Sequence, residues 1–513
     1  MKMLLFHIGT PTPVFETELE LIRKHERLGD RVRVLQCSGN LSNCFWNRDH
    51  IESLCTLCRS RFKNGWNVLN SGAGVDLKEI PPQDPAISEL PASFDSVSDI
   101  IRYKHDSANL GYGAASSLVS FFRDHRFDTR KHRDDIVREL RTATQMHEIL
   151  KREFQDFQPD LVYFFNGRIA SQLPAKLLCE RMGIPYASYE VAITRNSYRL
   201  LRGSTVHQAI PLEEIHLLHR DWSVERRRIG ESFFLLKRER TQFEHMPVYA
   251  GRQAGGVLPR GFDRNKRNIA IFNSTIDEYA ATEDWRNKIY EPDETAGIRK
   301  ILDSFESNDR FMFYLRVHPN LKDVSSRTSQ LLDIRELGFR FANLCVIWPE
   351  EVVDSYALMD ACEKVLTFGS TMGVEATYWG KPSILAGQAY YENFGCVHAP
   401  RTHEELVDLL KKDLEPSSAE SALKYGYWEL SNGIPFEHFE ETGFENGLAT
   451  GTFDGVEIGP DPLVAVWCRI QLFSWRALKA LTHPPVLFEF LRRRVRALKL
   501  ARPSRVKRKS GTP

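Results

Sequence analysis

A glycine and two hydroxyl residues interrupt an apolar run near position 370, and a helical pattern follows them. The stretch 365–384 reads VLTFGSTMGVEATYWGKPSI, with Gly369, Ser370 and Thr371 at the break and Glu375 one helical turn later. In an open parallel sheet, ligands bind beyond the carboxyl ends of the strands, where a helix start offers N–H groups to an anion. The pattern predicts that Ser370 and Thr371 bind a phosphate and that Glu375 binds ribose hydroxyls. A helix cap followed by a surface carboxylate is the alternative.

A histidine and a proline end a second apolar run. Arg316, His318 and Pro319 lie at the end of the sequence FYLRVHPN. Because proline cannot continue the hydrogen bonding of a strand, the strand ends here and His318 lies at the carboxyl edge of the sheet. A guanidinium and an imidazole at that edge suit the phosphate of a leaving group. A histidine satisfied within its loop is the alternative.

Two further strand ends carry polar residues. In IAIFNSTIDEY, Ser274 and the acidic residues Asp277 and Glu278 follow an apolar run. In VIWPEEVVDSYALM, a proline turn leads to a short helix in which Tyr356 could line a nucleobase. The carboxyl ends of parallel strands share one edge of the sheet, so these groups are expected to lie near His318 and Ser370.

The segments between these sites alternate short β-rich runs with amphipathic helical stretches. Such alternation predicts parallel α/β domains with right-handed crossovers. The chain is long enough for two large domains. We expect an N-terminal domain over 1–248 with a four-cysteine insertion at 37–58, a linker over 249–267, a C-terminal domain over 268–461, and a closing helix with a basic tail over 462–513.

Composition limits the classes of function. Apolar residues make up 42% and charged residues 27% of the chain, as in soluble proteins, and a formal net charge of +1 argues against general attraction to nucleic acid. The N-terminal apolar run is too short for a signal peptide, and no window is apolar enough to span a bilayer. A cytoplasmic protein is expected.

The histidine-proline pair and the serine/threonine motif with its following glutamate resemble those of bacterial capsule-polysaccharide and surface-glycan glycosyltransferases of GT-B architecture. They are also similar to motifs with which sialyltransferases and Kdo transferases hold a cytidine monophosphate sugar. The resemblance implies two Rossmann-like domains facing a cleft. It further implies donor phosphate contacts from His318, Ser370 and Thr371, with Glu375 near the ribose.

The N-terminal half would then bind the acceptor and supply the base. Asn166 and Arg168 follow a predicted strand at 161–165, where a loop would face the cleft, although Asn-Gly is also ordinary turn chemistry. Glu190 ends the next predicted strand and is our first candidate for the general base. Asp277 and His7, the latter at the end of the first predicted strand, are rivals.

Four of the nine cysteines lie within 22 residues, at Cys37, Cys44, Cys55 and Cys58. In a chain without an export signal, a structural zinc site with four thiolate ligands accounts for this spacing better than disulfides do. Buried unligated thiols and redox pairing remain open alternatives. No cofactor is expected for catalysis.

The C-terminal end differs in composition from the rest. An amphipathic pattern over 462–481 predicts a helix packed across the domains. Beyond it, residues 491–509 contain ten Lys or Arg and no acid, concentrated in the basic tail 492–509. This tail could be a solvated arm, or it could place the protein at an anionic surface on the inner face of the cytoplasmic membrane.

Together these patterns predict a metal-independent glycosyltransferase that moves a sugar from a CMP-, UDP- or GDP-activated donor to a glycan or glycolipid acceptor. A nucleotide-sugar epimerase on the same fold is one alternative. A scaffold of a glycan assembly or export complex, with no catalytic activity, is the other.

Overall fold

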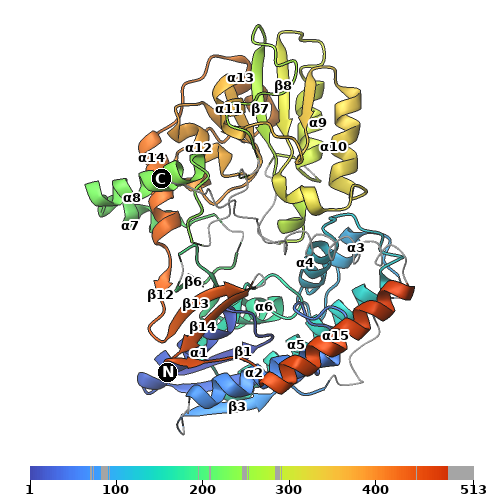
Figure 1. Cartoon of the computed structure of the whole chain (residues 1–513), viewed down its shortest axis with the longest axis vertical. Helices are drawn as coiled ribbons and strands as arrows, with labels where there is room; N and C mark the ends of the chain where they lie inside the picture. The colour runs from blue at the N-terminus through green and yellow to red at the C-terminus, as the bar shows by residue number, and fades with distance from the viewer. Residues whose placement is uncertain are drawn as a thin grey trace, which may run out of the picture.

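The computed structural model describes residues 1–482 apart from 70–71, 73, 83–89, 92, 195, 207–208, 245–250, 252, 283–288, 291 and 446–447. The basic tail 492–509 lies outside the described residues. The chain forms two α/β units, one above the other in Figure 1.

The lower unit is built on a seven-stranded sheet of order β12-β6-β5-β4-β1-β2-β3. Its strands are β1 (Lys2–His7), β2 (Arg31–Gln36), β3 (Val75–Glu79), β4 (Leu161–Phe165), β5 (Tyr186–Val191), β6 (Ser197–Arg202) and β12 (Ile434–Pro435). The first five strands are parallel to one another, β6 pairs with β5 in the antiparallel direction, and β12 pairs with β6 in the antiparallel direction. The order outward from β1 is that of a Rossmann-like sheet.

Helices cover both faces of this sheet because side chains alternate across each strand. Met3 and Leu5 pack on one face, while Leu4 and Phe6 pack on the other. The helices are α1 (Val14–Arg27), α2 (Glu52–Leu69), α3 (Val97–Ile101), α4 (Gly111–Phe122), α5 (Arg133–Phe157) and α6 (Leu173–Met182).

The upper unit contains a five-stranded, fully parallel sheet of order β11-β10-β7-β8-β9, which is again Rossmann-like. Its strands are β7 (Arg267–Phe272), β8 (Phe311–Arg316), β9 (Leu344–Ile347), β10 (Lys364–Thr367) and β11 (Ser383–Leu385). Its helices include α9 (Glu294–Asp303), α10 (Ser329–Arg340), α11 (Ser355–Ala361), α12 (Met372–Tyr378) and α13 (His403–Lys411). The prediction of two Rossmann-like domains in a GT-B-like arrangement is confirmed.

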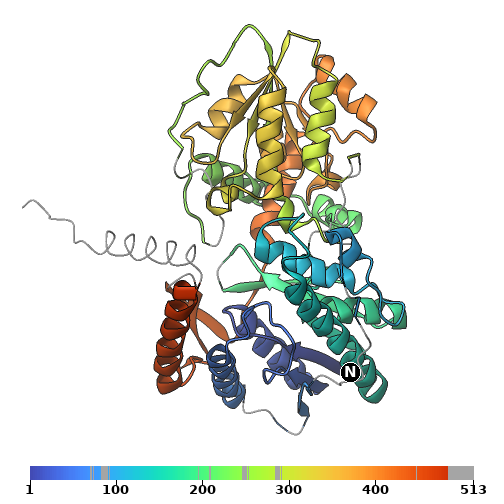
Figure 2. The ribbon, with the colours of Figure 1, turned by 90° about the vertical axis from the view of Figure 1, so that its right-hand side faces the viewer.

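Segments from both sides of the expected linker cross between the units. Helices α7 (Leu212–Arg220) and α8 (Val224–Arg238) precede it, yet both pack against α14 (Ala419–Ser431) (Figure 2). After α14 the chain returns to the lower unit, where β12 joins the first sheet. A small antiparallel sheet of β13 (Phe439–Glu445), β14 (Leu448–Phe453) and β15 (Val456–Glu457) packs there too.

Two glycines allow α8 and α14 to pack closely. A Cβ added to Gly230 of α8 would lie 2.2 Å from the backbone oxygen of Leu423, and one added to Gly426 of α14 would lie 2.5 Å from the oxygen of Gly230. Backbone can approach backbone only because neither residue has a side chain. This crossing positions the ends of both helices beside α12, where the candidate site lies.

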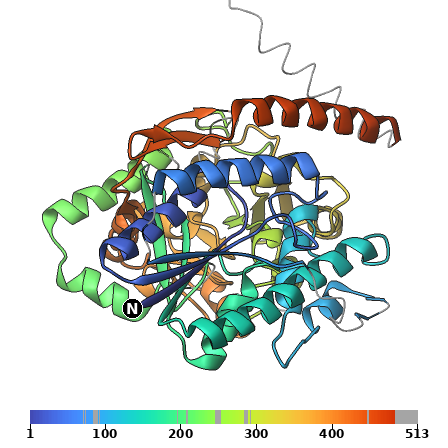
Figure 3. The ribbon, with the colours of Figure 1, turned by 90° about the horizontal axis from the view of Figure 1, so that it is seen from below.

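The last described helix, α15 (Pro462–Thr482), lies along α2 on the outside of the lower unit (Figure 3). The helix expected over 462–481 is therefore present, but its contacts are with α2 of the lower unit, whereas the sequence pattern predicts packing across the domains. Within the described part of the chain, no helix is both long and apolar enough to cross a membrane.

Candidate active site

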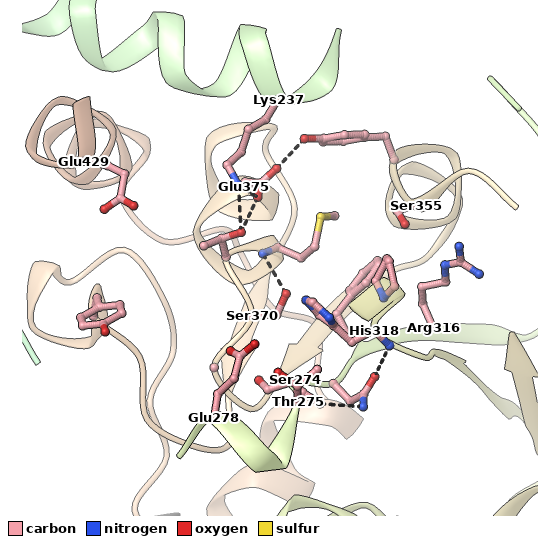
Figure 4. Close-up of a pocket in the computed structure, with 18 of the residues that line it drawn as sticks. Lys237, Ser274, Thr275, Glu278, Arg316, His318, Ser355, Ser370, Glu375 and Glu429 are labelled. Carbon is pink, nitrogen blue, oxygen red and sulfur yellow. Dashed lines mark hydrogen bonds and ion pairs between the residues drawn. The ribbon is translucent and has the colours of Figure 1, made fainter. Parts of the chain in front are cut away.

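The carboxyl edge of the upper sheet opens into a cavity of about 350 Å³ (Figure 4). Residues that follow β7, β8 and β10 line it, together with residues of α8, α11, α12 and α14. All seven residues predicted to bind the donor lie on its wall: Ser274, Arg316, His318, Tyr356, Ser370, Thr371 and Glu375. Their convergence follows from the parallel sheet, which brings its strand ends to one edge.

Glu375 is buried and is held by groups of the protein itself. Its carboxylate accepts hydrogen bonds from Thr371 Oγ1 at 2.8 Å and from the Tyr356 hydroxyl. The Thr371 hydroxyl proton is thus directed at Glu375, away from any anion in the cavity. Ser370 differs, because its Oγ accepts from the backbone N–H of Met372 at 3.3 Å and keeps its own proton to donate.

Lys237 is a cation of the cavity that the sequence patterns did not indicate. It extends from α8, and its Nζ lies 3.4 Å from Thr371 Oγ1 and 3.7 Å from Glu375 Oε1. It reaches the cavity only because α8 crosses α14 at the two glycines. No motif around residue 237 reveals this placement, which depends on the packing of α8 against α14, two helices far apart in the chain.

His318 lies partly exposed at the cavity wall as a neutral imidazole. Its Nδ1 accepts from the backbone N–H of Asn320 at 3.2 Å, which places the proton of the neutral ring on Nε2. Burial lowers the pKa of His318 to about 4, opposed by Glu278 and reinforced by Arg123, Lys237 and Arg316. The ring is therefore a hydrogen-bond donor without charge at neutral pH.

Arg316 lines the cavity, but its charge is directed elsewhere. Its Nη1 donates to the backbone oxygen of Trp348 at 2.7 Å, and its Nη2 donates to that of Glu351 at 3.3 Å. Burial lowers the pKa of this guanidinium. Arg316 thus fixes the loop between β9 and α11, which holds Ser355 and Tyr356 at the cavity wall.

The turn after β7 presents hydroxyl groups that have no acceptor. The Oγ of Ser274 and the Oγ1 of Thr275 are buried and lack a hydrogen-bond partner within the described residues. Beneath them, Glu294 accepts from the Ser274 N–H at 3.1 Å, and burial raises the pKa of Glu294 to about 8. Unsatisfied buried hydroxyls are costly, so such groups usually have a ligand or water as partner.

All three predicted bases lie outside this cavity, and two of them, Asp277 and His7, are paired with a charged side chain. Asp277 is buried in an ion pair with Arg123, and burial raises its pKa. His7 is buried against Glu18; burial alone would lower its pKa, but Glu18 and Cys58 raise it to about 9. A histidine that is already protonated cannot accept the proton of an acceptor hydroxyl. The cavity contains instead Glu278, the neighbour of Asp277, and Glu429 of α14.

Glu190, Asn166 and Arg168 do come together. Asn166 Nδ2 donates to Glu190 Oε1 at 2.5 Å, and Arg168 Nη1 donates to the backbone oxygen of Glu278 at 3.2 Å across the unit boundary. Burial raises the pKa of Glu190 against the opposing effects of Asn166 and Arg168. Glu190 lines a second cavity of about 300 Å³, and Tyr390 lines both cavities.

The four clustered cysteines are free thiols in this structure, and the zinc site stays a prediction. A tetrahedral zinc would hold four sulfurs at bonding distance of one point. Among the described residues, the one group of three potential metal ligands with mutually close donor atoms consists of Glu20, Glu437 and His438. Cys37 lies within electrostatic range of Cys55 and Cys58, and Cys58 lies beside His7, which lowers the pKa of the thiol against burial.

No model of a protein family matches the chain, and no curated protein does. Similar solved structures include a β-Kdo 2,4-transferase from Thermosulfurimonas dismutans, with 15% identity over 52% of this chain and 79% of that chain and a TM-score of 0.32. A UDP-GlcNAc 2-epimerase from Methanocaldococcus jannaschii is 12% identical over 83% of this chain and 98% of that one, with a TM-score of 0.26. The calicheamicin glycosyltransferase CalG4 is 12% identical over 84% and 95% of the two chains, with a TM-score of 0.24. At such values the likeness assigns no activity or site residue to this chain.

Proposed function

We propose that this protein is a glycosyltransferase that binds an activated nucleotide sugar in the upper cavity and transfers its sugar to a hydroxyl of a glycan or glycolipid. The observation that supports this most is the set of donors in one cavity at the carboxyl edge of a Rossmann-like sheet. It comprises the Lys237 ammonium, the His318 imidazole and the hydroxyls of Ser274, Thr275 and Ser370.

These donors suit a phosphate. A nucleotide that leaves with negative charge is stabilised by a fixed cation and by preorganised hydrogen-bond donors, which need no rearrangement during reaction. Lys237 supplies the charge, and His318 and Ser370 supply neutral donors. A cavity of about 350 Å³ falls within the usual range for small-molecule sites. Tyr356 and the loop fixed by Arg316 would contact the nucleobase of the donor. Glu375 would keep the side chains of Thr371 and Lys237 in place.

The acceptor would enter from the second cavity. Tyr390 lines both cavities, and Arg168 of the lower unit donates a hydrogen bond to the backbone oxygen of Glu278. We propose Glu278 as the general base, because it is the carboxylate of the donor cavity whose backbone contacts the acceptor-side unit. Glu190 remains the rival from the lower unit. No catalytic metal is needed if Lys237 and the neutral donors stabilise the leaving phosphate, so activity should survive EDTA.

The first test is calorimetric titration with CMP, UDP and GDP. We expect one of them to bind, and His318→Ala and Ser370→Ala each to weaken binding about tenfold, as expected for loss of a hydrogen bond to a charged group. His216→Ala, on the exposed side of α7, is the matched control and should leave affinity unchanged. If no nucleotide binds, or if both cavity variants bind like the wild type, the donor site is wrongly assigned.

Product analysis then separates the activities. Release of the nucleoside phosphate together with growth of a glycan acceptor supports transfer. Conversion of the free donor into an epimer without any acceptor would mean that the protein is an epimerase. Normal glycan production in cells by the His318→Ala variant would instead favour a scaffold role.

A further inference from the structure

Helix α15 is fixed to the outside of the lower unit at its N-terminal end. The Asp461 carboxylate accepts from the backbone N–H groups of Leu463 and Val464, and the backbone N–H of Asp461 donates to Ser60 Oγ of α2 at 2.9 Å. Arg61 and Asn64, also on α2, donate to the backbone oxygens of Ile458 and Gly459 just before the helix. One face of α15 is therefore held inward, and the opposite face is fixed toward solvent.

The outward face is apolar. The exposed side chains range from 42% of the surface of Trp467 to 80% of that of Leu463. The other exposed apolar residues of the helix are Val466, Ile470 and Phe473. These five residues, which we name the α15 stripe, recur at intervals of three and four and thus share one side of the helix. Cys468, on the opposite side, is buried.

A surface helix normally turns its apolar face to the core and its polar face to water. In α15 the outward face is also apolar, and contiguous apolar surface of this kind marks an interaction site. Scattered exposed hydrophobes elsewhere, such as Phe339 on α10, do not form such a row. A partner outside the described chain would bury this apolar surface.

The charge of the adjoining sequence indicates which partner. Arg469 lies exposed beside the stripe, and residues 491–509 contain ten Lys or Arg and no acid. Apolar side chains that include Trp and Phe, together with basic residues, are the combination that binds the boundary of an anionic bilayer. A nucleic acid would use the charges but not the stripe, and a second copy would bring two basic tails together.

We propose that the α15 stripe docks on an anionic lipid surface, with the helix in the plane of the interface and the basic tail on the headgroups. The apolar side chains enter the acyl boundary, while the body of the protein stays in water. This contact would place the acceptor-side unit beside the membrane, at the inner face if the protein is cytoplasmic. The proposal does not depend on the proposed transferase activity.

The test is co-flotation of the full chain with vesicles of equal parts phosphatidylglycerol and phosphatidylcholine, compared with phosphatidylcholine alone. We expect binding to the anionic vesicles that weakens with added salt. The double variant Ile470→Asp with Phe473→Asp should lower partitioning at least about tenfold, because two large apolar groups leave the interface. Replacing Arg492, Arg493 and Arg494 by Gln should lower it roughly fivefold per residue.

Phe339→Asp is the matched control, since it places a new charge at a more exposed apolar residue, 86% exposed, on the other unit. It should bind vesicles like the wild type, and all variants should share its thermal unfolding midpoint. Wild-type chain that does not float, or an α15 variant that floats like the wild type, would overturn the proposal. The proposal would also be overturned if an α15 variant bound vesicles like the wild type but differed from it in the mass measured by sedimentation. In that case a second copy of the chain would cover the stripe.

Discussion

Two histidines lie at the carboxyl ends of parallel strands, one in each sheet, and their surroundings give them opposite charge states. His7 ends β1, packs against the rings of Phe15 and Phe62, and pairs with Glu18, so its pKa rises to about 9. His318 follows β8, faces a cavity and has a pKa of about 4. We call the strand end at His7, which is filled by side chains, the closed edge. We call the strand ends around His318, which line the cavity, the open edge.

The difference shows what sheet topology decides and what it leaves to side chains. Topology brings strand ends together in both units. In the lower unit the aromatic side chains and the Glu18 pair fill the space, and the Tyr189 hydroxyl completes the network by donating to Glu18 at 2.7 Å. In the upper unit, short hydroxyl side chains after β7 and β10 leave the space open. Space for a nucleotide is therefore present beside His318 and absent beside His7.

The largest predicted effect tests whether chemistry occurs at the open edge. Glu278→Gln keeps the shape of the side chain but cannot accept a proton, so turnover should fall about 100-fold to 10,000-fold. Nucleotide affinity should change less than about twofold, because the amide retains hydrogen bonding. Steady-state transfer assays and calorimetry measure the two quantities, with exposed Glu404→Gln as control. Full turnover in this variant, with loss in Glu190→Gln, would move the base to the lower unit.

The second prediction concerns the closed edge. His7→Gln removes the positive partner of buried Glu18, and the free energy of unfolding should fall by about 3 kcal/mol near pH 6. A pKa raised from its unfolded value to about 9 gives stability that is complete below about pH 6.5 and is lost as pH rises through 9. The deficit of the variant should therefore shrink toward pH 9. Denaturant unfolding across this range measures it.

Nucleotide affinity provides the contrast between the two edges. His7→Gln should bind nucleotide as the wild type does at temperatures where both are folded. Weakened binding without loss of stability would mean that the lower edge is part of the donor site after all.

The third prediction tests the helix crossing that positions Lys237. Gly230→Ala places a methyl group against the backbone of Leu423, and overpacking of this kind should cost about 1–3 kcal/mol of stability. Because α8 must shift, Lys237 moves and nucleotide affinity should fall as well. Thermal unfolding and calorimetry report the two effects. Gly255→Ala, where an added Cβ meets nothing within 4 Å, should show neither. An unchanged midpoint in Gly230→Ala would mean that the crossing is looser than the structure shows.

Sequence patterns located the parts of the site that lie on strand ends. Ser274, His318 and Ser370 each follow an apolar run, and parallel strands bring such positions to one edge, so the sequence was sufficient to group them. Patterns could not locate Lys237 or Glu429, because both lie on helices whose packing depends on Gly230 and Gly426. No local signal connects these segments.

Asp277 and Glu278 are adjacent in the sequence, but the sequence did not reveal that only Glu278 lines the cavity. Asp277 and Glu278 lie together in the 3₁₀ turn η1 (Ile276–Glu278), and capture of Asp277 by Arg123 leaves Glu278 at the cavity. Arg123 belongs to the lower unit, so a tertiary contact determines which of the two carboxylates lines the cavity.

The smallest predicted effect concerns the charge state of His318 during binding. A neutral imidazole contributes a hydrogen bond whose strength does not depend on pH between about 6 and 8, well above its pKa of about 4. The phosphate itself titrates near pH 6, so absolute affinities change with pH in any variant. The difference in binding free energy between wild type and His318→Gln cancels that contribution. We expect this difference to stay constant within about twofold in affinity across the range.

If the imidazole bound as a cation, the advantage of the wild type would shrink about tenfold for each pH unit above the bound-state pKa, because the charged form would become rare. Calorimetry at several pH values distinguishes the two cases, and a shrinking advantage would show that ligand charge makes the open-edge histidine resemble His7 at the closed edge.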